Sequence, residues 1–383
     1  MKIISVVGAR PNFMKVAPLC RALKTYQEVE HLLVHTGQHY DVRMSEQFFR
    51  ELDIPNPDIN LGIGSGSHAE QVGKTMMAFE KVLREEKPDW VVVFGDVNAT
   101  IACSITAKKE HVRCAHVEAG LRSRDMDMPE EVNRLVTDRL SDLLFTPDRL
   151  SDANLRAEGV PDGKIKFVGN IMIDTLERER EKAETLDLNE IVRENLITEG
   201  GDAASTGRSV PPLRDDAYVA VTLHRPSNVD QADTLVPAVR FFLDEVASEH
   251  PLVWAVHPRT RKMLEAFGLW REVVEHPNVV PVNPLGYHAM LRLNMGARLF
   301  LTDSGGLQEE CCVLGTPCLT MRWNTERPVT LMENGGASIL VGNAVEKIRA
   351  AYRAQIDAPR RASRPELWDG HAAERIADVL LKA

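Results

Sequence analysis

Two carboxylates follow apolar runs in the first half of the chain. Asp96 comes directly after WVVVFG, and Glu118 comes directly after RCAHV. Each run reads as a buried strand, so both acids should project from the same edge of a parallel sheet. Burial and crowding of like charges raise the pKa of at least one carboxyl group in such a place, which suits proton transfer near neutral pH. The sequence therefore predicts acid-base chemistry at Asp96 and Glu118.

Two further acids, Glu130 and Glu131, follow Pro129 in the segment MPEEVNR. Proline favours the first position of a helix, and acids in the first helical turn complement the helix dipole without any other function. Glu131 points about 100° away from Glu130 around such a helix. We expect Glu131 to serve the dipole or a salt bridge.

Segments that suit an anionic group occur in both halves of the chain. The segment GARPNFMK turns sharply from a strand into a helix, and Arg10 and Lys15 add positive charge there. The segment TDSGGLQEE has the same strand-to-helix pattern, and its paired glycines let a phosphate approach the first turn of a helix. Its candidate phosphate contacts are Ser304, Gly305 and Gly306. The alternative is an ordinary turn with solvated charges in each case.

Three other side chains are candidates for the same ligand. Glu310 lies farther into its helix, so it would reach past the phosphate and accept hydrogen bonds from ribose hydroxyls. Arg327 of TERP and His224 of TLHRPSN each follow a strand and suit a phosphate or sugar. The alternatives, a surface arginine and a locally satisfied histidine, stay open at this point.

Composition narrows the class of protein. The 46 Lys and Arg against 56 Asp and Glu give a net charge of -10, and no basic block occurs, which disfavours nucleic-acid binding. No run of 18 apolar residues indicates a membrane span, and the apolar start is too short for a signal peptide, so we expect a cytoplasmic protein. Six cysteines without CxxC spacing read as reduced core residues.

Known cofactor motifs are missing from the sequence. It contains no GxGxxG fingerprint, no P-loop and no His/Cys metal cluster. We therefore expect neither a cofactor nor a metal, and we assign the ligand phosphate to the substrate.

The elements that must position these residues alternate between β-branched runs and helical patterns. This alternation is typical of βαβ units and parallel sheets, and it predicts an α/β protein with two Rossmann-like domains facing a cleft. We expect an N-terminal domain over residues 1–168 that carries the acid-base residues. A C-terminal, ligand-phosphate-binding domain should cover 169–365, and a helix over 366–383 should pack back on the N-terminal domain.

The motifs together resemble one known family. GARPNFMKVAPL, HTGQHYD, FGDVNAT, HVEAGLRS, MPEEVNR, TLHR, TDSGGLQEE and TERP occur in the order found in the non-hydrolysing UDP-N-acetylglucosamine 2-epimerases, from residue 1 to about residue 345. The resemblance implies a glycosyltransferase-B-like fold, interconversion of UDP-N-acetylglucosamine and UDP-N-acetylmannosamine, no redox cofactor, and a homodimer. One departure is Asn12, where many members have an acid.

The resemblance also implies residue roles. Asp96, Glu118 and Glu130 would form the acid-base set around the sugar, steadied by Arg134, and His224 would lie beside the diphosphate. The uridine diphosphate would contact Arg10, Lys15, Ser304, Gly305, Gly306, Glu310 and Arg327. A second UDP-N-acetylglucosamine molecule would act as an activator at Gln38, His39 and Gln71.

The reaction itself demands such a set. The C2 hydrogen of the sugar is not next to a carbonyl, so simple deprotonation would leave an unstabilised carbanion. Elimination of UDP to a 2-acetamidoglucal, followed by re-addition with the proton on the opposite face, avoids this and needs two separately placed acid-base groups. The product would serve cell-surface polysaccharide synthesis.

Three alternatives stay open at this point. A retaining glycosyltransferase would share the fold, and a non-catalytic nucleotide-sugar sensor would bind without turnover. A 2-epimerase of a related sugar, such as a UDP-2,3-diacetamido uronic acid, would share the motifs.

Overall fold

The chain forms two compact units. The computed structural model describes residues 1–37, 49–198 and 210–383. Unit 1 comprises Met1–Arg178 and Pro365–Ala383, and unit 2 comprises Glu179–Arg364. The sequence places the corresponding boundaries at 168 and 365, so the first observed boundary lies ten residues later, inside a helix that spans Ile171–Glu184.

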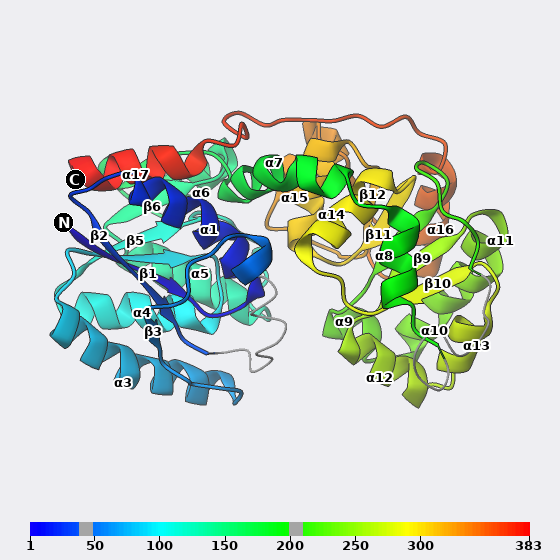
Figure 1. The fold of residues 1–383 in the computed structure, drawn as a ribbon, viewed down its shortest axis with the longest axis horizontal. Helices are drawn as coiled ribbons and strands as arrows, with labels where there is room; N and C mark the ends of the chain where they lie inside the picture. Colours follow the sequence, from blue (N-terminus) through cyan, green and yellow to red (C-terminus); the bar gives the residue numbers. More distant parts are fainter. Residues whose placement is uncertain (38–48, 199–209) are drawn as a thin grey trace. The chain divides into compact units, whose positions relative to one another are not determined.

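A parallel sheet of seven strands forms the centre of unit 1, in the order β3-β2-β1-β4-β5-β6-β7 (Figure 1). The order reverses between β1 and β4, as in Rossmann folds, where ligands bind beside this switch point at the strands' carboxyl ends. The strands are β1 (Lys2–Val7), β2 (Glu30–His35), β3 (Ile59–Asn60), β4 (Trp90–Phe94), β5 (Arg113–Val117), β6 (Leu143–Thr146) and β7 (Ile165–Phe167).

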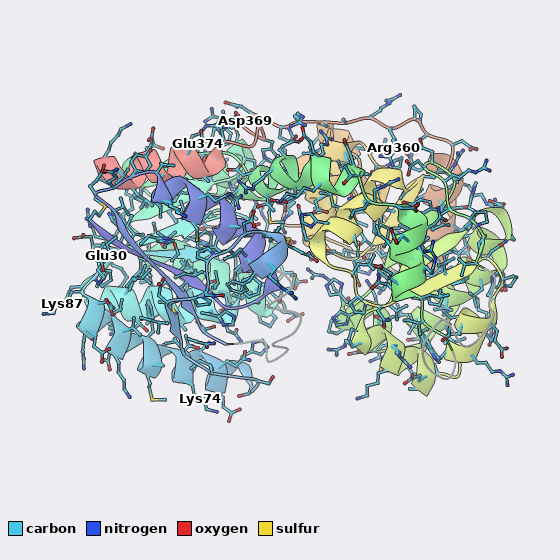
Figure 2. All side chains as sticks on the ribbon, in the orientation of Figure 1. Glu30, Lys74, Lys87, Arg360, Asp369 and Glu374 are labelled. Atoms are coloured by element: carbon cyan, nitrogen blue, oxygen red, sulfur yellow. The ribbon has the colours of Figure 1, made fainter. Side chains whose placement is uncertain are left out.

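Helices cover both faces of this sheet (Figure 1). They are α1 (Arg10–Lys24), α3 (His68–Glu86), α4 (Asn98–Lys109), α5 (Pro129–Leu140), α6 (Arg149–Ala157), α7 (Ile171–Glu184) and α17 (Ala372–Lys382). The central helix α4 packs against both α3 and α5, because its small buried residues Ala99, Ala102 and Ala107 let its neighbours approach. Charged side chains such as Lys74 on α3 and Glu374 on α17 lie on the outer surface (Figure 2).

The last helix, α17, belongs to unit 1 and packs on α1. The carboxylate of Asp174 in α7 accepts hydrogen bonds from the backbone N–H groups of Ala372 (3.0 Å) and Ala373 (2.7 Å), which satisfies donors at the start of α17. Burial outweighs these bonds and raises the pKa of Asp174 to about 6. The apolar side chains of Ile376 and Leu380 complete the contact because they are fully buried.

Unit 2 repeats the architecture with a six-stranded parallel sheet, in the order β10-β9-β8-β11-β12-β13. Its switch point lies between β8 and β11. The strands are β8 (Val219–Thr222), β9 (Leu252–Ala255), β10 (Val279–Val282), β11 (Leu299–Thr302), β12 (Cys318–Thr320) and β13 (Ser338–Leu340). The helices are α8 (Leu188–Asn195), α9 (Pro226–Val229), α10 (Ala232–Phe241), α11 (Ala247–Glu249), α12 (Pro258–Ala266), α13 (Trp270–Glu275), α14 (Tyr287–Gly296), α15 (Gly305–Leu314) and α16 (Val345–Gln355).

Two features are absent from the described residues. No helix within 1–37, 49–198 and 210–383 is long and apolar enough to cross a membrane. In the same ranges, no group of three or more His, Cys, Asp or Glu side chains could hold a metal ion. All six cysteines are buried and none forms a disulfide, as expected of core residues.

Candidate active site

Most of the predicted site residues follow strands that flank the two switch points. In unit 1, Lys15 comes after β1, Asp96 after β4 and Glu118 after β5. In unit 2, His224 comes after β8 and Ser304 after β11. The two units therefore each present a set of polar residues at the edge where Rossmann-like sheets bind ligands.

Lys15 and Glu118 form a buried ion pair in unit 1. Both side chains are about 95 % inaccessible, and the Lys15 ammonium contacts Oε2 of Glu118. The sequence predicts a diphosphate contact for Lys15, and in the structure this lysine pairs with a candidate catalytic acid. A buried carboxylate needs such a partner, because an unpaired buried charge costs several kcal/mol.

Gly95 makes room for that pair. A Cβ atom at Gly95 would lie 2.9 Å from Nζ of Lys15 and 3.1 Å from Oε2 of Glu118, and the residue has a positive φ of 61°. Glu118 itself has a φ of 74°, which is uncommon for a residue with a side chain. Such strain often marks functional positions.

Asn12 joins the turn after β1 to the end of β4. Its Oδ1 accepts from the backbone N–H groups of Gly8 (3.1 Å) and Ala9 (3.2 Å), while its Nδ2 donates to the carbonyl of Phe94 (3.0 Å). This position needs one acceptor and one donor, which an amide supplies and a carboxylate does not. Asn12, which stands where many family members have an acid, therefore fits its surroundings in this protein.

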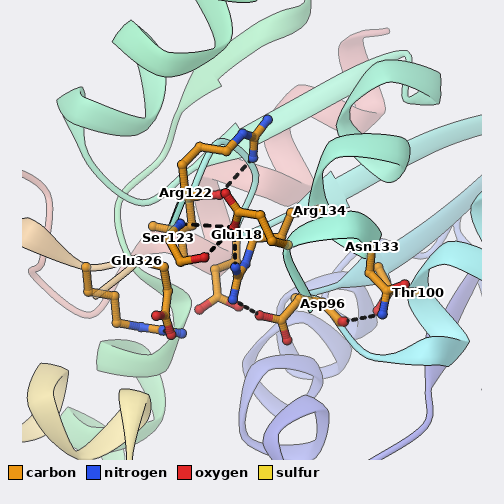
Figure 3. A network of polar contacts seen from close by, with 12 residues as sticks. Asp96, Thr100, Glu118, Arg122, Ser123, Asn133, Arg134 and Glu326 are labelled. Carbon is orange, nitrogen blue, oxygen red and sulfur yellow. Dashed lines mark hydrogen bonds and ion pairs between the residues drawn. The ribbon is translucent and has the colours of Figure 1, made fainter. Parts of the chain in front are cut away.

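Asp96 is held by helix α5. Nη2 of Arg134 lies 2.5 Å from Oδ2 of Asp96, and Nδ2 of Asn133 donates to the Asp96 carbonyl at 2.7 Å (Figure 3). The Asp96 side chain is 24 % exposed, so it is both paired and accessible. Arg134 thus steadies an acid as the sequence predicts, and Asn133 is a contact that the sequence reasoning missed.

Glu130 and Glu131 have different surroundings. Glu130 is half-buried at the start of α5, on the same helical face as Asn133 and Arg134, three and four residues later. It therefore lies on the face that holds Asp96.

Glu131 is almost fully buried and clamps the loop before the helix. Its carboxylate accepts from Ser123 N and Oγ (both 3.0 Å), from Arg124 N (2.8 Å), and from Nη1 of Arg134 (2.6 Å). Burial opposes ionisation, but these bonds outweigh it and lower the pKa of Glu131. The salt bridge that the sequence predicts exists, but Glu131 also shapes the loop.

In unit 2, Asp303 anchors the loop that carries His224. The Asp303 carboxylate accepts from the backbone N–H groups of His224 (3.0 Å) and Arg225 (2.8 Å), and from Nδ2 of Asn228 (3.1 Å). It also lies 2.8 Å from Nδ1 of the His224 ring. Burial opposes ionisation, yet the His224 bonds and charge outweigh it and lower the pKa of Asp303 to about 2.

This anchor was missed by the sequence reasoning. Its signal is an acid directly after β11, the strand that pairs with β8. Thr302 of β11 lies opposite Thr222 of β8, so Asp303 and the residues just after Thr222 must be close. His224 is 40 % exposed, which leaves its ring accessible to a ligand.

Helix α15 begins at the two predicted glycines, with Ser304 as its N-cap residue. A Cβ atom at Gly305 would lie 2.8 Å from Nη1 of Arg327 and 2.9 Å from Oε1 of Glu326, so the glycine leaves room for these two side chains. The start of α15 therefore combines free backbone N–H groups, the helix dipole and a guanidinium, which together suit an anion.

Arg327 is more constrained than the sequence predicts. It is buried, and its guanidinium pairs with Oε1 of Glu309 (2.9 Å) and with Glu326. The sequence predicts a phosphate contact, and the structure places the guanidinium beside Gly305 with two carboxylates holding it.

Glu310 is also buried, next to Glu309 in α15. Burial and the charge of Glu309 raise the pKa of Glu310 to about 7. This carboxyl group therefore changes its charge near neutral pH.

The candidate activator residues are only partly described. Gln38 and His39 lie outside the described residues, as does the side chain of Arg10. Gln71 of α3 donates to the carbonyl of Gly64 (3.2 Å) and accepts from Nδ2 of Asn98 (2.8 Å), the first residue of α4.

Comparison with known proteins decides the family. The family model described as UDP-N-acetylglucosamine 2-epimerase matches residues 21–381. A UDP-N-acetylglucosamine 2-epimerase of Methanocaldococcus jannaschii is 41 % identical over 99 % of both chains. The chain belongs to the UDP-N-acetylglucosamine 2-epimerase family. This membership makes it an isomerase by family and confirms the resemblance found in the sequence.

Solved structures of the family share the fold. A crystal structure of the M. jannaschii UDP-GlcNAc 2-epimerase in complex with UDP-GlcNAc and UDP matches the whole of both chains with a TM-score of 0.88 and 39 % identity. The prediction of two Rossmann-like domains of the glycosyltransferase-B-like class is thereby confirmed. Another relative is named for a different sugar. It is a UDP-2,3-diacetamido-2,3-dideoxy-D-glucuronate 2-epimerase of Pseudomonas aeruginosa, which is 37 % identical over all of both chains.

Proposed function

We propose that this protein catalyses reversible epimerisation at C2, interconverting UDP-N-acetylglucosamine and UDP-N-acetylmannosamine. The observation that carries the proposal is the pair of strand-end acids in unit 1, Asp96 and Glu118, each held by a buried cation in a member of this family. A cation beside a carboxylate compensates for the cost of burying its negative charge.

The reaction runs by elimination and re-addition. A carboxylate removes the C2 proton as the C1–O bond to UDP breaks, giving a 2-acetamidoglucal and the UDP anion. UDP then adds back to C1 while a second group protonates C2 on the opposite face. Asp96, Glu118 and Glu130 supply these two functions, and the assignment of each acid to one face of C2 is open.

Unit 2 holds the uridine diphosphate in this proposal. The free N–H groups at the start of α15 and the ring of His224 stabilise the departing diphosphate, because oriented donors and positive charge favour a leaving anion. The proposed contacts are Arg10, Ser304, Gly305, Gly306 and Arg327 for the diphosphate and Glu310 for the ribose. Lys15, which pairs with Glu118, is a further proposed diphosphate contact.

Further features complete the proposal. A second UDP-N-acetylglucosamine molecule acts as an activator through Gln38, His39 and Gln71. The enzyme works as a cytoplasmic homodimer without cofactor or metal, and it supplies precursors for cell-surface polysaccharides. The N-terminal domain, residues 1–168 with the helix of 366–383, carries the acid-base set, and 169–365 carries the UDP contacts.

Deuterium incorporation tests the chemistry. The protein is incubated with UDP-N-acetylglucosamine in deuterium oxide without any acceptor sugar, and recovered substrate and product are read by proton NMR. We expect deuterium at C2 of both sugars. Release of UDP without deuterium at C2 would indicate a glycosyltransferase or hydrolase, and binding without any exchange would indicate a sensor.

The P. aeruginosa relative motivates a second candidate substrate, a UDP-2,3-diacetamido uronic acid. A panel of UDP-2-acetamido sugars, with and without a C6 carboxylate, separates the two candidates by kcat/KM. A preference for the uronic acid would replace the first substrate and leave the elimination mechanism in place.

A further inference from the structure

A fully buried histidine lies behind the two strand-end acids. His116 of β5 is 0 % exposed, and its ring bridges two elements. Its Nε2 lies 2.7 Å from the carbonyl oxygen of Gly95, the residue just before Asp96. Its Nδ1 lies 2.6 Å from Oδ1 of Asp138 in α5. His116 also precedes Glu118 by only two residues.

Counting protons fixes the charge of this ring. The Gly95 carbonyl can only accept, so Nε2 must carry a hydrogen. The Asp138 carboxylate is satisfied as an acceptor on its other oxygen, because Oδ2 faces Gly120 N (3.0 Å) and Nη1 of Arg122 (2.7 Å). With Asp138 ionised, Nδ1 must carry a hydrogen too, and a ring with both hydrogens is an imidazolium.

The Arg122 guanidinium, 2.7 Å from Oδ2, favours the ionised form of Asp138 without reference to His116. Burial opposes ionisation, and a charged His116 together with Arg122 outweighs burial and lowers the pKa of Asp138. A buried charge is tolerated when it is paired and hydrogen-bonded, as it is here on both sides.

The charged groups around His116 come from several packed elements. Besides Asp138 of α5, the loop after β5 brings Arg122, which pairs with Glu158, the residue just after α6, at 2.7 Å. The neighbouring strands place only apolar side chains beside it, because Val93 of β4 and Leu144 of β6 are its partners in register.

Two other ion pairs lie at the ends of β5. Lys108 of α4 pairs with Asp142 at 2.7 Å, and Asp142 accepts from Cys114 N at 2.9 Å, at the end away from the candidate site. Lys15 and Glu118 pair at the other end, against Gly95. Among the described residues, no titratable side chain other than Asp138 forms a hydrogen bond or ion pair with the His116 ring.

We infer that His116 is a positioning residue, a permanently charged imidazolium that ties the Gly95–Asp96 turn to α5 and β5 and stabilises the ionised forms of Asp96 and Glu118. It touches no substrate atom. The inference rests on the proposed function only in giving Asp96 and Glu118 their acid-base roles. The hydrogen bond to the Gly95 carbonyl fixes the backbone position from which the Asp96 side chain extends. The positive charge favours nearby carboxylates in their proton-accepting state.

Nitrogen NMR tests the charge directly and independently of activity. The protein is labelled with 15N-histidine, and the His116 signals are assigned by their loss in His116→Gln. We expect imidazolium shifts for both ring nitrogens from pH 6 to pH 9. His31 is an internal reference for a neutral ring, because burial lowers its pKa to about 4. Neutral shifts for His116 at pH 7 would overturn the inference.

Asp138→Asn removes the charge while it keeps the hydrogen bonds. The amide can donate to Nδ1 of a neutral His116, and its oxygen can accept from Gly120 N and Arg122. We expect this variant to fold, as judged by circular dichroism, and to show the shifts of a neutral ring with hydrogen on Nε2. Imidazolium shifts in this variant would contradict the role given to Asp138.

The pH profile separates positioning from mere support of the fold. Loss of the nearby positive charge should move the acid limb of kcat/KM to higher pH by about one unit in His116→Gln, with unchanged affinity for UDP. His31→Gln, a change of a buried histidine in strand β2 of the same sheet, is the control and should keep the wild-type profile. An unchanged profile in His116→Gln would overturn the inference. A wild-type protein with no C2 exchange would instead overturn the proposed function and leave the NMR result standing.

Discussion

Nδ1 of His224 lies 2.8 Å from Oδ1 of Asp303, and the same carboxylate binds the backbone of the loop that carries the histidine. One buried acid thus orients the ring and fixes its position. The low pKa of Asp303 keeps this arrangement unchanged throughout the neutral range. The opposite ring nitrogen, Nε2, is then the atom that would face the diphosphate in the proposed reaction.

Asp303→Asn should damage both functions of this acid. An asparagine offers one oxygen where several donors converge, and its NH2 group would face some of them, so we expect a loss of about 2–4 kcal/mol in the free energy of unfolding. The affinity for UDP should also fall. Urea denaturation and calorimetric titration with UDP measure the two effects. Asp244→Asn, on an exposed site of the same unit, is the control, and equal behaviour of the two variants would refute the assignment.

Lys15→Met tests the pairing of Lys15 with Glu118. Loss of the cation leaves a buried carboxylate unpaired, so we expect a destabilisation of about 3–5 kcal/mol. Lys15→Met combined with Glu118→Gln should recover much of the stability but none of the activity. A thermodynamic cycle of the four proteins gives the coupling between the two residues. Weakened UDP binding together with zero coupling would indicate that Lys15 binds the diphosphate and does not interact with Glu118.

Glu310 should make stability depend on pH in a definite direction. Its pKa rises from 4.5 to about 7 in the folded protein, so the folded state holds the proton more tightly than the unfolded state. The resulting stabilisation is complete below pH 4.5 and is lost as pH rises through 7, by about 3 kcal/mol. Glu310→Gln should lack this loss. The difference in unfolding free energy between wild type and variant, measured from pH 4.5 to 8, should therefore change by that amount, and a constant difference would refute it.

Glu130→Gln and Glu131→Gln should separate chemistry from architecture. Glu130 is a candidate acid-base group, so its amide should lower kcat by about 10²- to 10⁴-fold with a change in stability within about 0.5 kcal/mol. Glu131 clamps Ser123, Arg124 and Arg134, so its amide should cost about 2–4 kcal/mol of stability as well as activity. Thermal unfolding and the rate of C2 exchange are measured for both variants. A large loss of stability in Glu130→Gln and a loss of activity alone in Glu131→Gln would exchange the two roles.

The sequence predicted the positions of the main acids well for a simple reason. The runs before Asp96 and Glu118 are apolar and β-branched, and parallel strands bring their carboxyl ends to one edge whatever the details of packing. The strand pairing of β4 with β5 is indeed parallel and in direct register. The strands that the sequence did not distinguish, such as β3 and β7, have two and three residues, too few for a periodic signal.

Contacts between distant segments were beyond sequence reasoning. Lys15 and Glu118 are 103 residues apart, and Arg134 and Asp96 are 38 apart. A lysine after a strand suits a phosphate and a buried acid equally well from its type alone. Only the close approach at Gly95 decides between them, and that approach depends on the packing of β1, β4 and β5.

The return of the chain to unit 1 has a consequence for its synthesis. Residues 365–383 are made after unit 2, and the α17 helix among them packs on α1 and is capped by Asp174. During translation, unit 1 therefore lacks α17 until all of unit 2 has left the ribosome. The nascent chain must keep the apolar face of α1 from aggregating during that interval, and a ribosome stalled before residue 372 would display all of unit 2 while unit 1 still lacked this helix.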